Sequence, residues 1–171
     1  MTNNQKKIQK SSKVLFYVFL LVMCSCILQG LDVLWRLVYL LLNPTDAWAD
    51  LSSWIPYGDY TNLCVFLGCR TLLWGCLAAS YILLCLIFLD ISREYTPFRQ
   101  LHVRRLRQSS ALMIGGYLIQ IVQNTMYRAW FEGGQGIPLR GDPFLVPLAL
   151  IGLSYILDYA CQLQNEADTT L

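Results

Sequence analysis

The side chains of this sequence that could do chemistry are charged and amide residues inside or at the ends of long apolar stretches. Counted at 1.5 Å per residue from the more basic ends, the charged ones lie at one level, about 27–33 Å along three helices, with the amides somewhat deeper. The set is Asp32, Arg36, Arg70, Gln120, Gln123, Asn124 and Arg128. Ionisable residues at membrane depth are costly and are candidate functional residues. Because the set is net cationic, it predicts an outward-facing pocket for an anionic or polar ligand.

A structural interpretation of the same residues stays open. Asp32 and Arg36 are i,i+4 neighbours and can pair on one helix face. Gln120, Gln123 and Asn124 follow helical spacing, so they form a polar stripe that could bond one helix to another. The arginines could extend to lipid headgroups along their apolar stems. In that case the outer residues hold the helices together and bind nothing.

Catalysis and cofactor chemistry lack the residues that they need. The only histidine is His102, so bis-histidine haem ligation within the chain is excluded, and the seven cysteines include no Cys-x-x-Cys pair. No paired carboxylates or Cys/His cluster accompany the outer residues. We therefore predict no enzyme activity, no metal and no cofactor. Only Cys64 and Cys69 lie near enough to the outer face for a disulfide to be worth testing.

Four apolar stretches of 15 to 19 residues without charge must position these side chains: Val14–Leu31, Thr71–Leu89, Ser109–Tyr127 and Pro143–Leu157. A helix needs roughly 20 mostly apolar residues to cross a bilayer. Only 14% of the chain is charged, against about 25% in soluble domains. We predict an all-α integral membrane four-helix bundle in one domain, residues 1–171, with overlong first and second helices. The predicted helices cover about 13–42, 63–92, 97–130 (with a basic lead-in) and 143–163.

The distribution of basic residues predicts the orientation. The N-terminal tail and the connection between the second and third stretches carry nine Lys and Arg, whereas the other two connections carry only Arg128 and Arg140. By the positive-inside rule both termini lie in the cytoplasm, an N-in/C-in topology. At the inner ends, Asp90 and Asp158 have natural partners, and this ring is either structural or a switch. Those partners are Arg93, Arg104, Arg105 and Arg107.

Small residues and prolines give further local expectations. Gly75 and Ala79 form a small-xxx-small pair suited to close helix approach. Thr96 and Pro97 suit the N-cap and first position of a helix. The polar residues 1–12 are expected to be loose. The basic middle connection could also rest on anionic lipid, and no motif predicts direct nucleic-acid binding.

Two cytoplasmic segments resemble a known family. Thr96-Pro97-Phe98 is followed by Val103-Arg104-Arg105-Leu106-Arg107, and the chain ends in Leu163-Gln164-Asn165-Glu166-Ala167-Asp168-Thr169-Thr170-Leu171. Together with the four stretches, these segments resemble the bacterial domain of unknown function 2975 family, whose members are small four-span membrane proteins. The family often occurs beside a gene for a small helix-turn-helix regulator. The resemblance therefore implies the bacterial inner membrane and a regulator as partner.

The resemblance also implies which residues would contact that partner. They are Pro97, Phe98, Leu106, Arg107, Leu163, Gln164, Glu166, Asp168 and Thr170. The acidic tail offers charge complementary to a basic DNA-binding protein. The same complementarity would let the tail fold back onto Arg104, Arg105 and Arg107, and the sequence leaves this alternative open.

The function that these observations favour is a non-enzymatic sensor or membrane anchor that regulates a small helix-turn-helix transcription factor. The alternative is a small transporter or channel subunit that uses the outer polar residues as an entry site. Only the third stretch carries a polar stripe, so a pore would need a homo-oligomer. A membrane enzyme is the least favoured class.

Overall fold

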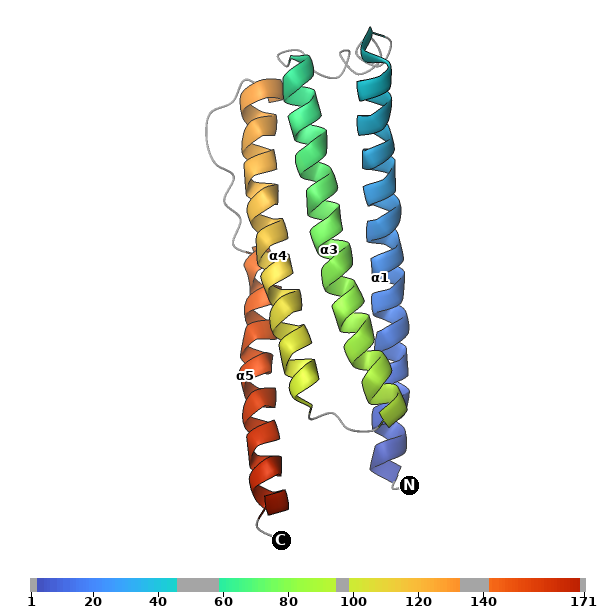
Figure 1. Ribbon diagram of the computed structural model, residues 1–171, viewed down its shortest axis with the longest axis vertical. Helices are drawn as coiled ribbons and strands as arrows, with labels where there is room; N and C mark the ends of the chain where they lie inside the picture. The colour runs from blue at the N-terminus through green and yellow to red at the C-terminus, as the bar shows by residue number, and fades with distance from the viewer. Residues whose placement is uncertain (1–2, 46–58, 95–98, 133–141, 170–171) are drawn as a thin grey trace.

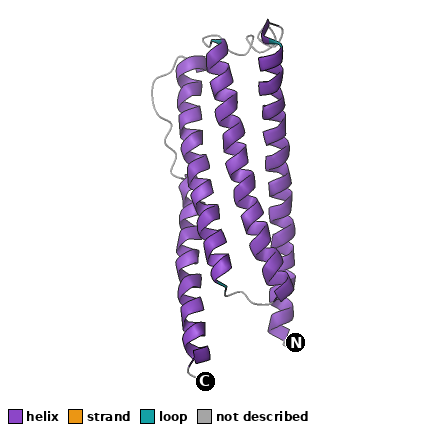
Figure 2. Ribbon diagram, in the orientation of Figure 1, coloured by secondary structure: helices purple, strands orange, loops and turns teal. Residues whose placement is uncertain are grey.

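The computed structural model describes residues 3–45, 59–94, 99–132 and 142–169, and these form long helices. They are α1 (Asn3–Leu42), α3 (Tyr60–Glu94), α4 (Gln100–Tyr127) and α5 (Asp142–Thr169). A π-helical turn, η1 (Arg128–Glu132), continues α4. No strand occurs in the described ranges (Figure 2). The predicted all-α class with four long helices is confirmed.

The four helices lie side by side in chain order and alternate in direction (Figure 1). Each packs mainly against its neighbour in the sequence: α1 with α3, α3 with α4, and α4 with α5. Both termini lie at the same end of the molecule (Figure 1). This is the geometry that an N-in/C-in topology requires.

The helix ends differ from the expected ones. α1 begins at Asn3, so residues 3–12 of the segment expected to be loose are helical. It is tied to α3, because Ser12 Oγ donates to the Phe88 carbonyl at 2.8 Å and Gln9 Nε2 donates to the Ser92 carbonyl at 3.3 Å. α4 begins later than expected, at Gln100, after an extended Arg99 that caps it without a side-chain hydrogen bond. The proposed capping residues at 96 and 97 lie outside the described residues.

Three of the described helices are long and apolar enough to cross a membrane. The segments are Gln9–Leu42 of α1, Tyr60–Arg93 of α3 and Phe144–Gln164 of α5. The chain is therefore a helical membrane protein by length and composition. α4 is not among the three, because its charge-free stretch Ser109–Tyr127 contains three amides, two serines and two glycines, which lower its mean hydropathy. That α4 also crosses the membrane stays a prediction.

Serines and glycines make close helix contacts, as membrane helices favour. A Cβ added to Gly30 of α1 would lie 3.3 Å from Trp74 Cβ of α3. Ser80 of α3 and Ser109 of α4 are both fully buried, and their hydroxyl oxygens lie 2.7 Å apart. Ser110 Oγ donates to the Pro147 carbonyl of α5 at 2.7 Å. The expectation for Gly75 is wrong, because a Cβ added there would meet nothing within 4 Å. Its position on the helix faces away from the neighbouring helices.

Candidate functional site

A polar pocket lies between α3 and α4 in their outer halves. Its volume is about 450 Å³, and four of the seven predicted ligand residues line it together with apolar and aromatic side chains. The lining consists of Phe66, Arg70, Leu73, Trp74, Gln120, Gln123, Asn124 and Tyr127. We call this cavity the outer pocket. The counted heights along α3 and α4 thus predicted a real juxtaposition of one cation and three amides.

The other three predicted ligand residues do not line the outer pocket. Asp32 and Arg36 form the expected i,i+4 ion pair on α1, with Nε 3.0 Å from Oδ2. Their side chains are 58% and 56% exposed, so the pair lies on the surface of α1. Arg128 is exposed at the start of η1. Residue counting predicted a height along each helix for these residues, but it did not consider the helix face.

The guanidinium and the three amides of the outer pocket make no hydrogen bond or ion pair with the residues that the structure describes. Gln123 is only 7% exposed, yet its amide makes no hydrogen bond to any residue that the structure describes. Arg70 forms no ion pair with any residue that the structure describes. Gln123 lines the outer pocket, so its amide can hydrogen-bond to a molecule that enters the pocket. A guanidinium beside such amides can bind the oxygens of a polar or anionic molecule.

Aromatic rings form the walls of the outer pocket. The rings of Phe66 and Tyr127 lie with centroids 6.0 Å apart, joining the outer ends of α3 and α4. Trp74 packs against the buried cluster that includes Phe66. Sequence reasoning did not include Phe66, Leu73 and Trp74 in the site. Their spacing from Arg70 (i−4, i+3 and i+4) is that of one helix face, and this signal could have identified them.

The contact between α3 and α4 is closed on the inner side of the outer pocket. A Cβ on Gly116 would lie 3.5 Å from both Cys76 Cβ and Leu73 Cδ1. Leu73 and Met113 are each 8% exposed. Further inward, the Ser80–Ser109 pair joins the two helices. The described residues therefore give the pocket an apolar floor.

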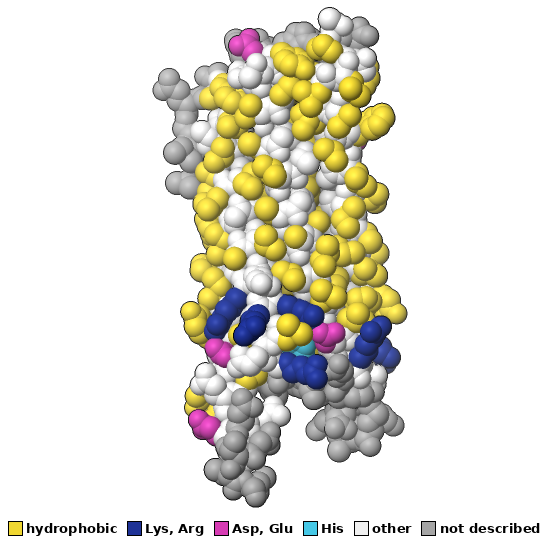
Figure 3. Space-filling view, viewed as in Figure 1, with side chains coloured by type: hydrophobic (Ala, Val, Ile, Leu, Met, Phe, Trp, Pro, Cys, Tyr) yellow, Lys and Arg dark blue, Asp and Glu magenta, His cyan; other side chains and the backbone are white. Residues whose placement is uncertain are grey.

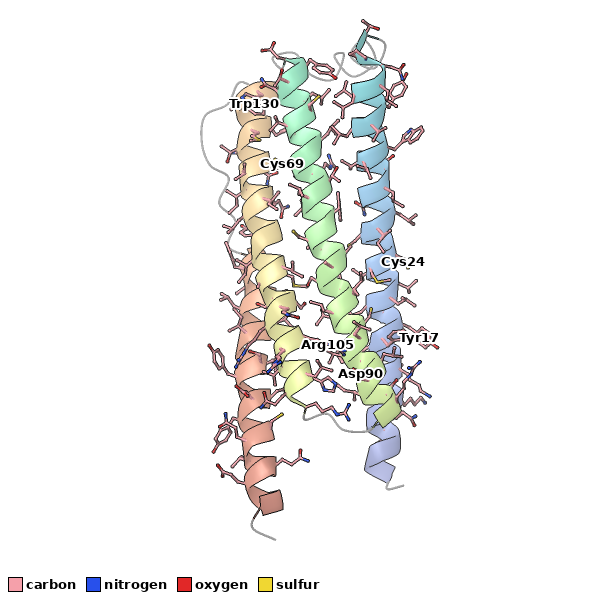
Figure 4. All side chains as sticks on the ribbon, viewed as in Figure 1. Tyr17, Cys24, Cys69, Asp90, Arg105 and Trp130 are labelled. Carbon is pink, nitrogen blue, oxygen red and sulfur yellow. The ribbon has the colours of Figure 1, made fainter. Side chains whose placement is uncertain are left out.

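Ion pairs at the opposite end of the molecule form the predicted inner ring. Arg105 Nη1 donates to Asp90 Oδ2, joining α4 to α3; Figure 4 shows the two side chains between these helices. Arg107 Nη2 donates to Asp158 Oδ2 at 2.8 Å, joining α4 to α5. His102 is 1% exposed, with Nε2 3.8 Å from Asp90 Oδ2. Figure 3 shows the charged side chains of this ring gathered below a mostly apolar face.

The residues of α4 that were predicted to bind a partner are buried or already engaged within the protein. Leu106 is 6% exposed in a core cluster, so it cannot contact a partner while α4 packs in this way. Arg107 is engaged by Asp158 and lies 5.1 Å from the Tyr155 ring. Pro97, Phe98 and Thr170 lie outside the described residues, as does the side chain of Asp168.

The C-terminal segment continues α5 as a helix to Thr169. Leu163, Gln164 and Glu166 are exposed on it. In Figure 1 this end of α5 extends beyond the start of α4. A straight helix that leads away from α4 does not fold back onto its arginines, and two of those, Arg105 and Arg107, already have aspartate partners. As far as Thr169, the backbone therefore does not support the fold-back alternative.

The cysteines and acidic residues show no metal-binding arrangement in the described part of the chain: no group of three or more His, Cys, Asp or Glu could hold a metal ion. All seven cysteines are free. Cys64 and Cys69 both belong to α3, five positions apart, and so lie on different faces of one helix. The disulfide considered between them does not form.

No family model, curated protein or solved structure matches this chain. The resemblance to the domain of unknown function 2975 family thus stays a prediction.

Proposed function

We propose that the chain is a multi-pass protein of the bacterial cytoplasmic membrane that binds a small polar or anionic ligand in the outer pocket and acts as a non-enzymatic sensor. One observation carries the proposal. Arg70 and Gln123 line the same cavity, and Gln123 is more than nine-tenths buried. Neither side chain forms a hydrogen bond or ion pair with the residues that the structure describes. A ligand with carboxylate, phosphate or sulfate oxygens would supply those partners.

Such a ligand would act by binding one arrangement of α3 and α4 better than another. Arg70 belongs to α3, whereas Gln120 and Gln123 belong to α4. A molecule bound to both sides stabilises the arrangement in which they face each other, and only this differential affinity can shift an equilibrium. The ligand thereby changes how α4 is held between its neighbours.

The output side of the proposal is the end of α5. Exposed Leu163, Gln164 and Glu166 form a helical surface beyond the inner ring. We propose that it contacts a small helix-turn-helix regulator, as the family resemblance implies. An apolar residue beside an acidic one suits a basic protein partner.

A small transporter or channel subunit would use the outer pocket as an entry site. The closed contact of Gly116 with Leu73 and Cys76 weighs against a path between α3 and α4 within one chain. A transporter must move the ligand past this contact, whereas a sensor needs no such movement. Flux of the bound anion into proteoliposomes would favour the transporter over the sensor.

The test of the pocket is ligand-dependent thermal stability of the purified full chain. The probes are inorganic phosphate, sulfate, acetate and succinate. A ligand at 100 times its Kd stabilises the folded state by about 2.7 kcal/mol, so at least one probe should raise Tm by several degrees. Arg70→Gln and Gln123→Leu should remove the shift, and Arg36→Gln, a basic residue at the same height outside the pocket, should retain it. An equal loss in all three variants would refute the pocket.

The test of the partner is a membrane pull-down with the intact chain and a form truncated after Gln162. Recovery of a small helix-turn-helix protein with the intact chain alone would support the role of the α5 end. Recovery with neither form would refute it and leave the ligand pocket to be judged by its own assay.

A further inference from the structure

A second pocket lies between α1 and α3 at the end of the molecule that carries the inner ring. Its volume is about 430 Å³. The residues that line it are Gln9, Lys13, Phe16, Tyr17, Leu89, Ser92 and Arg93. We call it the inner pocket. Its lining contains two cations, contributed by two different helices, and no acidic side chain.

Both cations are available to a ligand. In the described ranges neither Lys13 nor Arg93 forms an ion pair. The carboxylates of the inner ring are occupied elsewhere, since Asp90 binds Arg105 and Asp158 binds Arg107. The inner pocket therefore has a positive charge that the described protein does not neutralise.

Contacts within the protein hold the two walls of the inner pocket together. Ser12, 4% exposed, donates to the Phe88 carbonyl, and Gln9 donates to the carbonyl of Ser92, which is 8% exposed. One helical turn away, the Phe19 and Phe88 rings stack with centroids 5.3 Å apart. The spacing between Lys13 and Arg93 is thus set by packing, so a ligand would enter a preformed site.

The inner pocket lies where the apolar surface ends. Lys13 directly precedes the stretch Val14–Leu31, and Arg93 follows the apolar part of α3. Tyr17 is 62% exposed. Figure 4 shows it on the side of α1 that faces away from α3, at about the level of Asp90. An exposed tyrosine beside basic residues is typical of a membrane–water boundary. The pocket is therefore within reach of lipid headgroups.

We infer that the inner pocket binds the phosphate of an anionic glycerophospholipid between Lys13 and Arg93. The headgroup lies at the two cations, and the acyl chains extend along the apolar surface beside Phe16 and Leu89. Basic pockets between transmembrane helices on the cytoplasmic side are suited to acidic headgroups. Since α1 and α3 form both walls, the lipid bridges these helices, and the site is independent of the outer pocket on the other side of α3.

The test is native mass spectrometry of the full chain released from nanodiscs that contain phosphatidylglycerol and phosphatidylcholine with identical acyl chains. Wild type should retain one phosphatidylglycerol in preference to phosphatidylcholine. Each basic residue near a membrane surface contributes about a fivefold preference for anionic lipid, so Lys13→Gln/Arg93→Gln should reduce it by about twentyfold or more. Arg104→Gln, which removes an exposed charge at the same end of the molecule outside the pocket, should change it less than twofold.

Two further arms make the result decisive. The charge-preserving variant Lys13→Arg/Arg93→Lys should bind as wild type does, which separates lost charge from lost folding. Equal loss in Arg104→Gln, or none in the double variant, would overturn the site in favour of a diffuse surface charge. Adding glycerol 1-phosphate distinguishes the sources of the phosphate. Retained phosphatidylglycerol supports the lipid site, and displacement at millimolar concentration overturns it in favour of a soluble phosphate.

Discussion

The two ion pairs Asp90–Arg105 and Asp32–Arg36 should differ strongly in how much they stabilise the fold, because their burial differs. In the first pair the side chains are 26% and 20% exposed; in the second they are 58% and 56% exposed. The first pair also joins two helices, whereas the second lies within one. Asp90→Asn leaves a largely buried guanidinium without its carboxylate, while Asp32→Asn leaves an exposed one.

The expected magnitudes follow from these exposures. Removing one partner of a fully buried pair costs about 3–5 kcal/mol, and an exposed pair contributes about 0.2–1 kcal/mol. With about three quarters of each side chain buried, Asp90→Asn should cost about 2 kcal/mol. In a double-mutant cycle with Arg105→Gln, the coupling energy should be about 1.5 kcal/mol. The matching cycle of Asp32→Asn with Arg36→Gln should give about 0.3–0.5 kcal/mol.

The assay is reversible unfolding of the full chain in mixed micelles by increasing sodium dodecyl sulfate, followed by tryptophan fluorescence. Four variants and the two double mutants complete both cycles. A coupling energy for Asp32–Arg36 equal to or above that for Asp90–Arg105 would refute the reasoning. It would mean that the exposed pair lies in hydrocarbon and not at the outer boundary, about 29–35 Å along α1 from Lys13.

Three further predictions test the packing and the topology. Ser80→Ala should cost only about 0.6 kcal/mol in the same unfolding assay, a typical value for a hydrogen bond between membrane helices, whereas Ser80→Leu should cost about 1–3 kcal/mol by forcing α3 from Ser109; equal effects would contradict the close contact. Gly116→Ala should stabilise by up to about 1 kcal/mol, because its Cβ meets ordinary contacts at 3.5 Å and alanine favours helix, and a loss of stability would show a tighter contact. In a cysteine-free background, Gln164→Cys should react with an impermeant maleimide only in inside-out vesicles and Asp59→Cys only in right-side-out vesicles. Labelling of both from one side would contradict the predicted four crossings.

Residue counting along helices predicted the heights of side chains well. It placed Arg70 beside Gln120, Gln123 and Asn124, and these residues do line one cavity. It also paired the inner aspartates with arginines of the middle connection, and Arg105 and Arg107 are their partners. Both results follow because the helix rise is constant, so sequence separation converts directly into height.

The direction around each helix was not predictable in the same way. Asp32 and Arg36 were expected to face a pocket, but α1 is the end member of the row and presents them on its surface. Gly75 lies close to the height of Gly116, yet only Gly116 faces the neighbouring helix. Which side of a helix meets its neighbour depends on how all four helices are ordered. That order is a tertiary property that the spacing of residues within one stretch does not contain.

The hydrogen bonding of the three amides of α4 bears on the two interpretations of the polar stripe. If they served to bond helices together, their side chains would donate or accept hydrogen bonds across the α3–α4 contact, as Ser80 and Ser109 do. Within the part of the chain that the structure describes, none of Gln120, Gln123 and Asn124 makes such a bond. Their polarity also leaves α4 as the helix that falls short of the apolar criterion for a span, and no hydrogen bond among the described residues offsets that cost. This unmatched cost in the helix between α3 and α5 is why we propose a ligand as the reason for these residues.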